Sequence, residues 1–488
     1  MAKEKEIASD TIKKKHRGLW WKILLIVLAV IILVPLLFVG IVSAMNKGRG
    51  ERAKKDTITN TTGLVQTEGT SLYDKDGKRL ILRGVNAGGM LVTEGWMVPY
   101  SCGENKDENG NILYNHDKIP TYPTLTEEEA REGFLSNPNL TDEQRKTIID
   151  TYRANWFSEE DFKTIKNELG MNMIRLPFYY LDILKEDKET KTFTRKSEED
   201  AFSYFDWFLE QCKENEIYLI LDLHGAPGGN NGYEHSGQMN KNDLWRDETY
   251  INAIVDLWKY IATHYTETKP ELGQWIASYD LINEPCADLD DQDGGTKKVC
   301  FDVFDKIYQG IRSVGDNHVI TMEGVWDFTN FANPKDYGWT NIQYEFHQYN
   351  WQSSKIPEWL FEDYYELKIW GHYYDVPYYC GEFTCFDDEG VWKERMALYD
   401  KRAYSYSLWN YKIISLGWWT TTWGVKNAVL NLQEGKTKTN LKTATYDELL
   451  SMAESVTYIL NQTIMNGWPS IHNRAPKQRY NVWEKLMG

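Results

Sequence analysis

Two glutamates in the second half of the chain combine a residue type and a spacing that suggest catalysis. Glu284 and Glu382 each follow a short apolar run of strand length. If both runs belong to one closed parallel sheet, their carboxylates face each other at its carboxyl end. Two carboxyls about 5–5.5 Å apart can hydrolyse a glycosidic bond with retention, since one protonates the leaving oxygen and the other attacks the anomeric carbon. We predict that Glu284 is the acid/base and Glu382 the nucleophile.

This division of labour requires the two carboxyls to differ in protonation. The acid/base must hold a proton near neutral pH and the nucleophile must be ionised, so their surroundings must differ. Arg175 and Tyr349 are predicted to lie near Glu382 and to favour its anion. Asn283, next to Glu284, is predicted to hold the sugar 2-hydroxyl in a contact that strengthens in the transition state.

The elements that must position these residues alternate regularly along the chain. From Leu72 onward, short apolar runs alternate with amphipathic stretches of helical length, which predicts a parallel sheet with crossover helices. The number of runs is that of a closed barrel, so the predicted fold class is an α/β (β/α)8 TIM barrel. The predicted strands are 79–85, 171–176, 217–223, 277–282, 318–322, 342–346, 376–380 and 413–419. The predicted helices include 158–169, 200–214, 249–265, 298–313, 391–411 and 446–463.

Polar residues close almost every predicted strand, and in such a barrel these ends face the active site. A lone polar residue there is often structural, so the order of these residues along the chain carries more weight than any one of them. A polar insertion, residues 100–155, follows the first strand on a βα loop and is expected to shape the cleft. The strand ends are Arg83-Gly-Val-Asn86, Ile174-Arg175-Leu-Pro177, Leu221-Asp-Leu-His224, Leu281-Ile-Asn283-Glu284, Met322-Glu323-Gly, Phe346-His347-Gln-Tyr349, Gly381-Glu382-Phe383 and Trp418-Trp419-Thr-Thr-Thr-Trp423.

These residues and their order resemble glycoside hydrolase family 5, which belongs to a larger clan with both catalytic glutamates on strands four and seven. The resemblance extends over residues 71–488, and the segments Gly84–Pro99 and Asp222–Gly232 look most like the exo-β-1,3-glucanase branch. The likeness implies a retaining hydrolase of β-glucosidic bonds in glucans, with β-1,3-glucan as the expected substrate. By this likeness the family's active-site positions are taken by Arg175, His224, Asn283, Glu284, His347, Tyr349 and Glu382.

Two further residues are predicted to contact the sugar. Glu94 follows the first strand, and its carboxylate can accept hydrogen bonds from sugar hydroxyls, although a surface glutamate is the alternative. In the family an aromatic residue of the eighth strand supports the sugar. Trp419 or Trp423 can present it here, and we choose Trp423. The insertion leaves exo and endo cleavage both open.

Other classes of function were weighed against this interpretation. A metal-dependent hydrolase is disfavoured, because the chain contains neither the HxH pair nor the HExxH helix that such enzymes use to bind a metal. No metal and no cofactor is therefore predicted. A catalytically inactive, membrane-attached sugar-binding protein would not need both glutamates and Asn283. A β-1,4-glucanase, a mannanase or a glycolipid glycosidase would keep the same catalytic set. The ligands of a metal would come from Asp222, His224, His347 and Glu382.

The amino-terminal segment predicts a membrane anchor. Residues 23–45 contain no charged residue, and at about 1.5 Å per residue they can span a bilayer. Basic residues before the span place residues 1–22 in the cytoplasm, so the catalytic domain, 71–488, is expected outside the cell membrane on a flexible linker, 46–70. A cleaved signal peptide is the alternative, because Val42-Ser43-Ala44 offers small residues to a peptidase.

Composition narrows the partners. The net charge of −17 argues against nucleic-acid binding. Aromatic residues make up 14% of the chain and include 20 Trp, which can stack on sugars as well as fill a core. The six cysteines are irregularly spaced and are predicted to be mostly free and buried, with a Cys380–Cys385 bridge beside Glu382 as the alternative. The chain is expected to act as a monomer on a β-glucan polysaccharide or oligosaccharide.

Overall fold

The fold is known from a computed structural model of the whole chain. The chain divides into two units, Met1–Lys54 with Arg479–Gly488, and Lys55–Gln478. Every predicted site residue belongs to the second unit. The structure describes residues 21–22, 24–34, 37, 55–115, 120–288, 297–326, 330–349, 374–386, 388–402, 404–415, 423–429, 438–454, 459–461 and 464.

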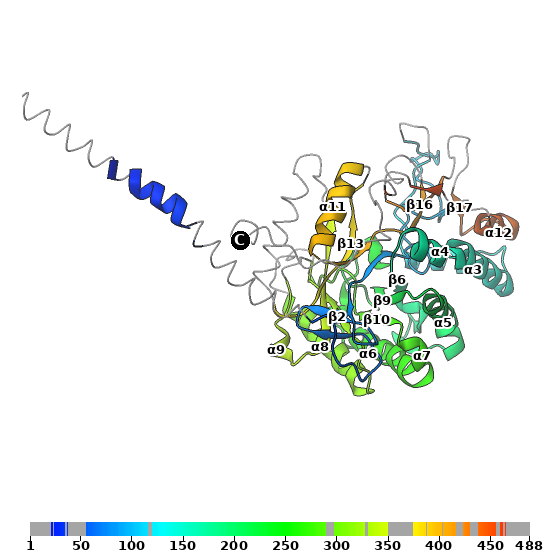
Figure 1. Cartoon of the computed structure of the whole chain (residues 1–488). Helices are drawn as coiled ribbons and strands as arrows, with labels where there is room; N and C mark the ends of the chain where they lie inside the picture. The colour runs from blue at the N-terminus through cyan, green and yellow to red at the C-terminus, as the bar shows by residue number, and fades with distance from the viewer. Residues whose placement is uncertain are drawn as a thin grey trace, which may run out of the picture. The chain divides into compact units, whose positions relative to one another are not determined.

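A closed barrel of parallel strands forms the centre of the second unit (Figure 1). Around the barrel the strands follow the order β10, β11, β12, β13, β14, β4, β6 and β9, and β14 pairs with β4 in parallel. The (β/α)8 prediction for this part of the chain is therefore confirmed. The barrel strands are β4 (Arg83–Asn86), β6 (Met173–Tyr179), β9 (Tyr218–Gly225), β10 (Ile276–Asp280), β11 (Ile320–Glu323), β12 (Ile342–Tyr349), β13 (Tyr378–Thr384) and β14 (Ser405–Leu408).

Helices between the strands bury one apolar face each. In α6 the residues Ile254, Leu257, Trp258 and Ile261 are at most 1% exposed, and their spacing is that of one helical face. Asp247 caps this helix by accepting the backbone N–H of Thr249. The described helices of this layer are α4 (Glu159–Lys163), α5 (Glu198–Glu214), α6 (Glu248–Thr263), α7 (Pro270–Gly273), α8 (Lys297–Ser313), α9 (Pro334–Tyr337) and α11 (Glu389–Arg402), and a hairpin of β7 (Leu184–Asp187) and β8 (Thr192–Arg195) follows β6.

The amino-terminal end of the barrel is closed by a small antiparallel sheet. β1 (Gln66–Glu68), β2 (Ser71–Tyr73) and β3 (Arg79–Leu80) form this sheet. Leu72 of this sheet and Val65, which directly precedes β1, belong to one apolar cluster with Met173 and Tyr218, which begin two of the barrel strands. The last part of the predicted linker, from Lys55 to Thr70, is therefore folded, because burial of Val65 beneath the barrel fixes its course.

The insertion after β4 folds together with a segment near the carboxyl end of the chain. Helix α3 lies against α12 (Figure 1). The side-chain amide of Asn137 donates to the carbonyls of Leu441 and Ala444, both at 2.9 Å. Phe134 and Leu449 share one apolar cluster. The elements of this body are β5 (Tyr100–Ser101), α2 (Glu127–Leu135), α3 (Asp142–Trp156), β17 (Thr439–Asn440) and α12 (Tyr446–Glu454).

The eighth barrel strand lies earlier in the chain than predicted. It is β14, whereas residues 413–415 of the predicted strand 413–419 belong to β15 (Lys412–Ser415), which lies in a separate sheet with β16 (Lys426–Val429) and β18 (Ile459–Leu460). The prediction favoured the more apolar run. The strand that the barrel contains instead, β14, includes the buried Ser407. Its hydroxyl donates to the carbonyl of Gly381 and accepts from the side-chain amide of Asn86.

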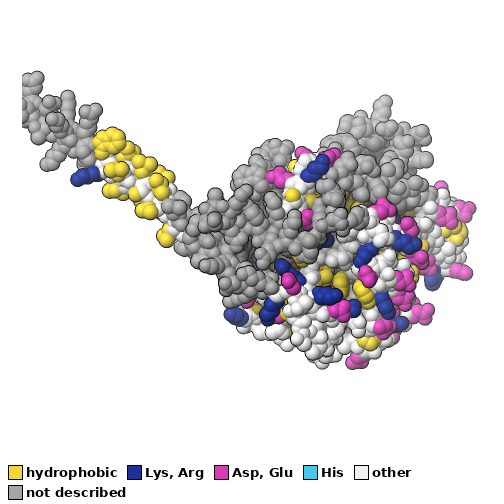
Figure 2. Space-filling view, viewed as in Figure 1, with side chains coloured by type: hydrophobic (Ala, Val, Ile, Leu, Met, Phe, Trp, Pro, Cys, Tyr) yellow, Lys and Arg dark blue, Asp and Glu magenta, His cyan; other side chains and the backbone are white. Residues whose placement is uncertain are grey.

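The predicted membrane span is described in part. Residues 24–34 are helical and their apolar side chains are exposed (Figure 2). Among the described residues, no helix is both long and apolar enough to cross a membrane. The rest of the predicted span, 23 and most of 35–45, lies outside the described residues. All six cysteines lie within the described residues, no disulfide joins any two of them, and five are buried, as predicted, so Cys380 and Cys385 form no bridge.

Candidate active site

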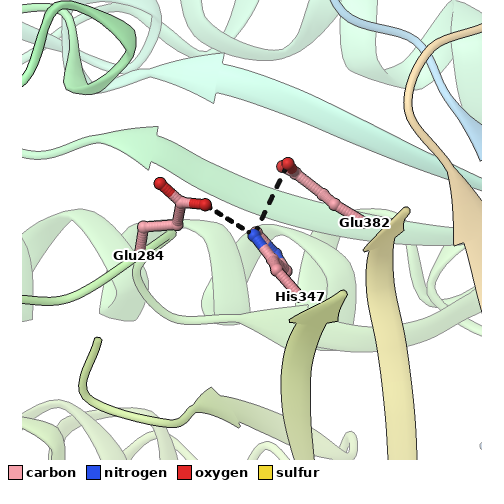
Figure 3. Close-up of side chains that lie close together, drawn as sticks. All are labelled: Glu284, His347 and Glu382. Atoms are coloured by element: carbon pink, nitrogen blue, oxygen red, sulfur yellow. Dashed lines mark hydrogen bonds and ion pairs between the residues drawn. The ribbon is translucent and has the colours of Figure 1, made fainter. Parts of the chain in front are cut away.

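Three barrel strands bring two glutamates and a histidine together (Figure 3). Glu284 follows β10, His347 lies in β12 and Glu382 lies in β13. Nδ1 of His347 is 2.8 Å from Oε1 of Glu284 and 3.5 Å from Oε2 of Glu382. One oxygen of each carboxylate and a ring nitrogen of His347 all lie within 4.8 Å of one another. The two glutamates therefore meet at the carboxyl end of the barrel.

Both oxygens of Glu382 accept hydrogen bonds from neighbouring side chains. Arg175 donates from Nη1 to Oε1 at 2.9 Å, and the hydroxyl of Tyr349 donates to Oε2 at 2.7 Å. Burial lowers the pKa of Arg175, but the carboxylates around it outweigh burial and hold that pKa well above its ordinary value. Burial and the charge of Glu382 raise the pKa of Tyr349 well above its usual range. Arg175 stays charged and Tyr349 stays a neutral donor.

Glu284 has a different set of partners. His347 occupies Oε1, and Nε2 of His235 lies 2.8 Å from Oε2. Burial raises the pKa of Glu284, but the two imidazoles outweigh burial and hold it well below its ordinary value. Burial lowers the pKa of His235, and the facing carboxylate of Glu284 raises it, with a net value of about 9. In the free protein the proton of this contact lies on the imidazole, which differs from the expectation that Glu284 itself is protonated.

The backbone of Glu284 is turned to point its side chain across the barrel mouth. Its φ is 42°, in the left-handed region that a glutamate seldom adopts. The N–H of Glu284 donates to Oε2 of Glu323 at 2.5 Å, and its carbonyl accepts the side-chain amide of Asn231 at 3.0 Å. These two contacts hold a backbone conformation that costs about 1–3 kcal/mol.

Arg175 also fixes Asn283. Nη2 of Arg175 donates to Oδ2 of Asp280 at 2.7 Å and to Oδ1 of Asn283 at 2.9 Å. Because the oxygen of Asn283 accepts from Arg175, its amide nitrogen is the donor, and it lies 3.4 Å from Nε2 of His224. Nδ1 of His224 is 2.8 Å from Asp222. Asn283 and His224 are thus held in defined orientations beside Glu284.

The remaining predicted sugar contacts, Glu94 and Trp423, are both buried. Glu94 is 8% exposed and accepts the indole N–H of Trp96 at 2.6 Å. Burial raises the pKa of Glu94 to about 7. The ring of Trp423 is 5.6 Å from that of Tyr349 and 5.3 Å from that of Trp96. Glu94 is a buried residue of the site, so the surface alternative for it is wrong. Trp419, the other candidate aromatic, lies outside the described residues.

With this geometry in view, comparison with known proteins assigns the chain to a family. Residues 140–422, more than half of the chain, match the family described as cellulase (glycosyl hydrolase family 5), and the match contains both facing glutamates. The chain belongs to glycosyl hydrolase family 5. It is therefore a glycoside hydrolase, as the sequence predicted, and the resemblance to family 5 is confirmed.

Relatives within family 5 have several named activities. A β-xylosidase of Phanerodontia chrysosporium is 26% identical over 72% of this chain and 71% of its own length. A glucan 1,3-β-glucosidase of Candida oleophila is 26% identical over 59% of this chain and 63% of its own. That of Lachancea kluyveri is 29% identical over 46% of this chain and 47% of its own. The chain thus spans from about half to about 70% of the length of these relatives.

Solved structures show the same fold. A rutinosidase from Aspergillus niger matches 68% of this chain and 90% of its own, with a TM-score of 0.50 and 17% identity. The structure described as AoRut matches 68% of this chain and 89% of its own, with a TM-score of 0.51 and 15% identity. At this identity the likeness concerns the fold alone.

In this family 5 site the donor atoms of Glu284, His347 and Glu382 converge closely enough to suggest a metal as well. The hydrogen bonds argue for a different use. Nδ1 of His347 is hydrogen-bonded to Glu284. The two oxygens of Glu382 accept hydrogen bonds from Arg175 and Tyr349. We interpret the cluster as paired acids with their hydrogen-bond partners, not as a set of ligands.

Three residues of the site were not predicted as site residues. His235 lies three residues beyond Asp222–Gly232, one of the two segments that resembled the exo-β-1,3-glucanase branch. Glu323 was noted at a strand end without a role, and it is now seen to hold the backbone of Glu284. Trp409 lies at the end of β14, and its ring stacks on His224 at 5.3 Å and 12°. Its alternating context, Tyr404-Ser-Tyr-Ser-Leu, was the strand signal that could have revealed it.

Proposed function

We propose that the protein hydrolyses β-glucosidic bonds of glucans with retention, through a covalent glycosyl-enzyme intermediate. The observation that carries the proposal is the close approach of two carboxylates in unlike surroundings. Oxygens of Glu284 and Glu382 lie within 4.8 Å, which suits the separation of about 5–5.5 Å in retaining enzymes and leaves no room for the water of an inverting one.

Each carboxyl then has one task in each of two steps. In the first step Glu284 gives a proton to the leaving oxygen, the bond from C1 to that oxygen breaks, and Glu382 forms a bond to C1. In the second step Glu284 takes a proton from water, the water oxygen bonds to C1, and the bond from C1 to Glu382 breaks. Arg175 and Tyr349 stabilise Glu382 both before the first step and as it leaves.

We propose β-1,3-glucan as the preferred substrate. Two of the three relatives described above are named glucan 1,3-β-glucosidases. The carboxyl of Glu94 is buried beside Trp96 and can accept or donate a hydrogen bond to one sugar hydroxyl, so a sugar lacking that hydroxyl leaves a polar group unpaired at a cost of about 1–3 kcal/mol.

A product analysis tests both parts of this proposal. The catalytic unit from Lys55 onward is incubated with laminarin, cellulose, mannan and aryl β-xyloside, the last because one relative is named a β-xylosidase. We expect the highest kcat/KM on laminarin and, by proton NMR, a β-configured first product. An α-configured product overturns the retaining mechanism, and a higher rate on another substrate overturns the β-1,3 preference.

We further propose that residues 23–45 anchor the enzyme in the cell membrane with the catalytic domain outside. The proposal rests on the uncharged run and on the basic residues before it. The full-length protein should remain with membranes in alkaline carbonate and high salt, while external protease should remove the catalytic domain from intact cells. A mature chain that begins near Met45 would show a cleaved signal peptide instead.

A further inference from the structure

His235 reaches Glu284 from outside the barrel strands. It lies in the short helix Glu234–Ser236, in the loop after β9. Its ring is parallel to that of Tyr233, with centroids 5.7 Å apart and planes at 13°. Tyr233 in turn stacks on Trp326 at 5.1 Å and 11°. This stack fixes the plane of the imidazole, and Nε2 in that plane lies 2.8 Å from Oε2 of Glu284.

Asn231 makes this contact suitable for two positions of one proton. The orientation of its amide is set, because Oδ1 accepts the N–H of Tyr233 at 2.9 Å and Nδ2 donates to the carbonyl of Glu284 at 3.0 Å. The same Nδ2 lies 2.9 Å from Nε2 of His235. A neutral Nε2 has one lone pair and can accept from Asn231, whereas a charged Nε2 donates to an ionised Glu284 and faces the Asn231 amide as a second donor. The charge of Glu284 thus favours the charged imidazole and the Asn231 amide favours the neutral one, so the two contacts oppose each other at Nε2.

The charges around His235 decide where the proton rests before substrate binds. The carboxylates that act on the imidazole are those of Glu284, Glu94 and Glu382. The ring of His224 is 6.5 Å away, and His347 occupies the other oxygen of Glu284. Burial lowers the pKa of His235, but the carboxylates raise it to about 9. When Glu382 bonds to the sugar it loses its charge, which weakens the hold of His235 on its proton.

We propose that His235 is a positioning residue that stores the proton of Glu284 from the end of one turnover to the start of the next. In the first step Nε2 of His235 passes its proton to Oε2 of Glu284 as Glu284 gives a proton to the leaving oxygen, so the imidazole is neutral and Glu284 is ionised in the glycosyl-enzyme intermediate. In the second step Glu284 takes a proton from the attacking water and returns one to Nε2. Protons balance over the cycle, with His235 charged and Glu284 ionised at its start and end. This inference rests on the proposed retaining function.

The pH dependence of His235→Gln tests this role. Glutamine can still donate a hydrogen bond to Glu284 but cannot carry the proton, so a merely structural role would be preserved. On laminari-oligosaccharides we expect kcat to fall about 10–100-fold, the size of a general-acid contribution, and the basic limb of kcat/KM to move at least about one pH unit toward acid. A dinitrophenyl glucoside, which needs no acid, should lose less than about threefold in kcat/KM. An unmoved basic limb overturns the inference.

A matched control is available in the outer layer of the fold. His264 is also buried and faces a carboxylate, with Nε2 3.0 Å from Asp206, but it lies just after α6 and far from the strand ends in sequence. His264→Gln should leave the pH profile unchanged. A shift in this variant equal to that of His235→Gln would trace both effects to general electrostatics and overturn the assignment to His235.

A second measurement requires no activity. The pKa of His235 is followed by NMR of histidine-labelled protein, in the wild type and in Glu284→Gln. We expect the substitution to lower it by at least about one unit, since the largest favourable charge is lost. An unchanged value overturns the inference. If the wild type hydrolyses no β-glycoside, the proposed function fails, and this titration still decides whether the pair shares a proton.

Discussion

The two ends of the barrel are built on opposite principles. At the amino-terminal end Val65, Leu72, Leu82 and Met173 are at most 3% exposed and belong to one apolar cluster. At the carboxyl end the barrel buries Arg175 among carboxylates instead. Apolar burial stabilises a fold without regard to exact position, whereas buried charges need partners at fixed distances. One end therefore contributes stability and the other contributes chemistry.

The carboxyl end also crowds like charges. Burial raises the pKa of Asp280 and of Glu323 well above the ordinary value, and the nearby carboxylates raise both further. Burial brings the pKa of Glu94 to about 7. Because these raised pKa values oppose ionisation in the folded protein, the free energy of unfolding should fall as the pH rises. Substitutions at the two ends should accordingly separate activity from stability.

The largest effect is expected from the facing glutamates. Glu382→Ala and Glu284→Ala should each lower kcat by several orders of magnitude, because each removes a group that takes part in bond making or proton transfer. Thermal unfolding should change little, since no apolar core is lost. Azide should rescue Glu382→Ala to an α-glycosyl azide and Glu284→Ala to a β-glycosyl azide. The same anomer from both variants would contradict the assigned roles.

The second effect concerns the opposite end. Leu82 is fully buried in the apolar cluster, and Leu82→Ala should lower the free energy of unfolding by about 2–5 kcal/mol while leaving kcat unchanged at a temperature where the variant is folded. Urea unfolding and steady-state kinetics on one preparation give both numbers. Leu113→Ala, at a side chain that is 43% exposed, is the control and should change neither the free energy of unfolding nor kcat. A loss of kcat in Leu82→Ala would show that the two ends are coupled.

A smaller effect is expected at Tyr349. Tyr349→Phe removes the hydroxyl that donates to Glu382 at 2.7 Å, and we expect kcat to fall about 10–100-fold with a lesser change in KM. The measurement is a full kinetic analysis on a β-glucoside. Asn283→Ala should behave similarly toward substrates that carry a 2-hydroxyl. Wild-type kinetics in both variants would mean that these strand ends play no part in the transition state.

The smallest effect is a change of slope with pH. Glu94 has an ordinary pKa of 4.5 and a folded pKa of about 7, so the folded state binds its proton more tightly than the unfolded state. The free energy of unfolding must then decrease as pH rises between those values. Glu94→Gln should reduce this decrease, between pH 5 and 8, by about 1–3 kcal/mol. Urea titrations at both pH values test it, and an equal slope in both proteins would place Glu94 in a more exposed setting.

Glu94→Gln should also act on substrate choice. We expect a raised KM and a lowered kcat/KM on laminari-oligosaccharides, with less effect on an activated aryl glucoside. If the substitution changes neither, the β-1,3 preference loses its structural basis while the roles of Glu284 and Glu382 stand.

Seven of the eight barrel strands could be predicted from the sequence, because fully buried strands are continuous apolar runs that end in polar residues. The eighth was misplaced because β14 is only partly apolar. Ser407 makes contacts inside the barrel with Asn86 and Gly381, whereas the predicted run 413–419 is more hydrophobic, yet its described residues 413–415 lie in another sheet. Hydrophobicity alone does not report which strand fits beside which neighbour.

In the site, residues at strand ends could be predicted to lie together, whereas residues on loops could not. Arg175, Tyr349 and Glu382 were found together because a barrel brings its strand ends together whatever the details of the loops. His235 depends on the course of the loop after β9, which the strand pattern does not fix. The location of the proton between His235 and Glu284 depends on summed charges at short range, and these emerge only from distances.

The union of the insertion with the end of the chain has a consequence for biosynthesis. Asn137 binds the carbonyl of Leu441, 304 residues later, and β4 must wait for β14 to close the barrel. A ribosome releases the amino-terminal part first, so the apolar faces around Phe134 and Ile148 are made long before Leu449 exists to cover them. A nascent or truncated chain that stops before residue 440 therefore displays these faces to chaperones and proteases. These exposed faces are a feature by which quality control can recognise an unfinished copy.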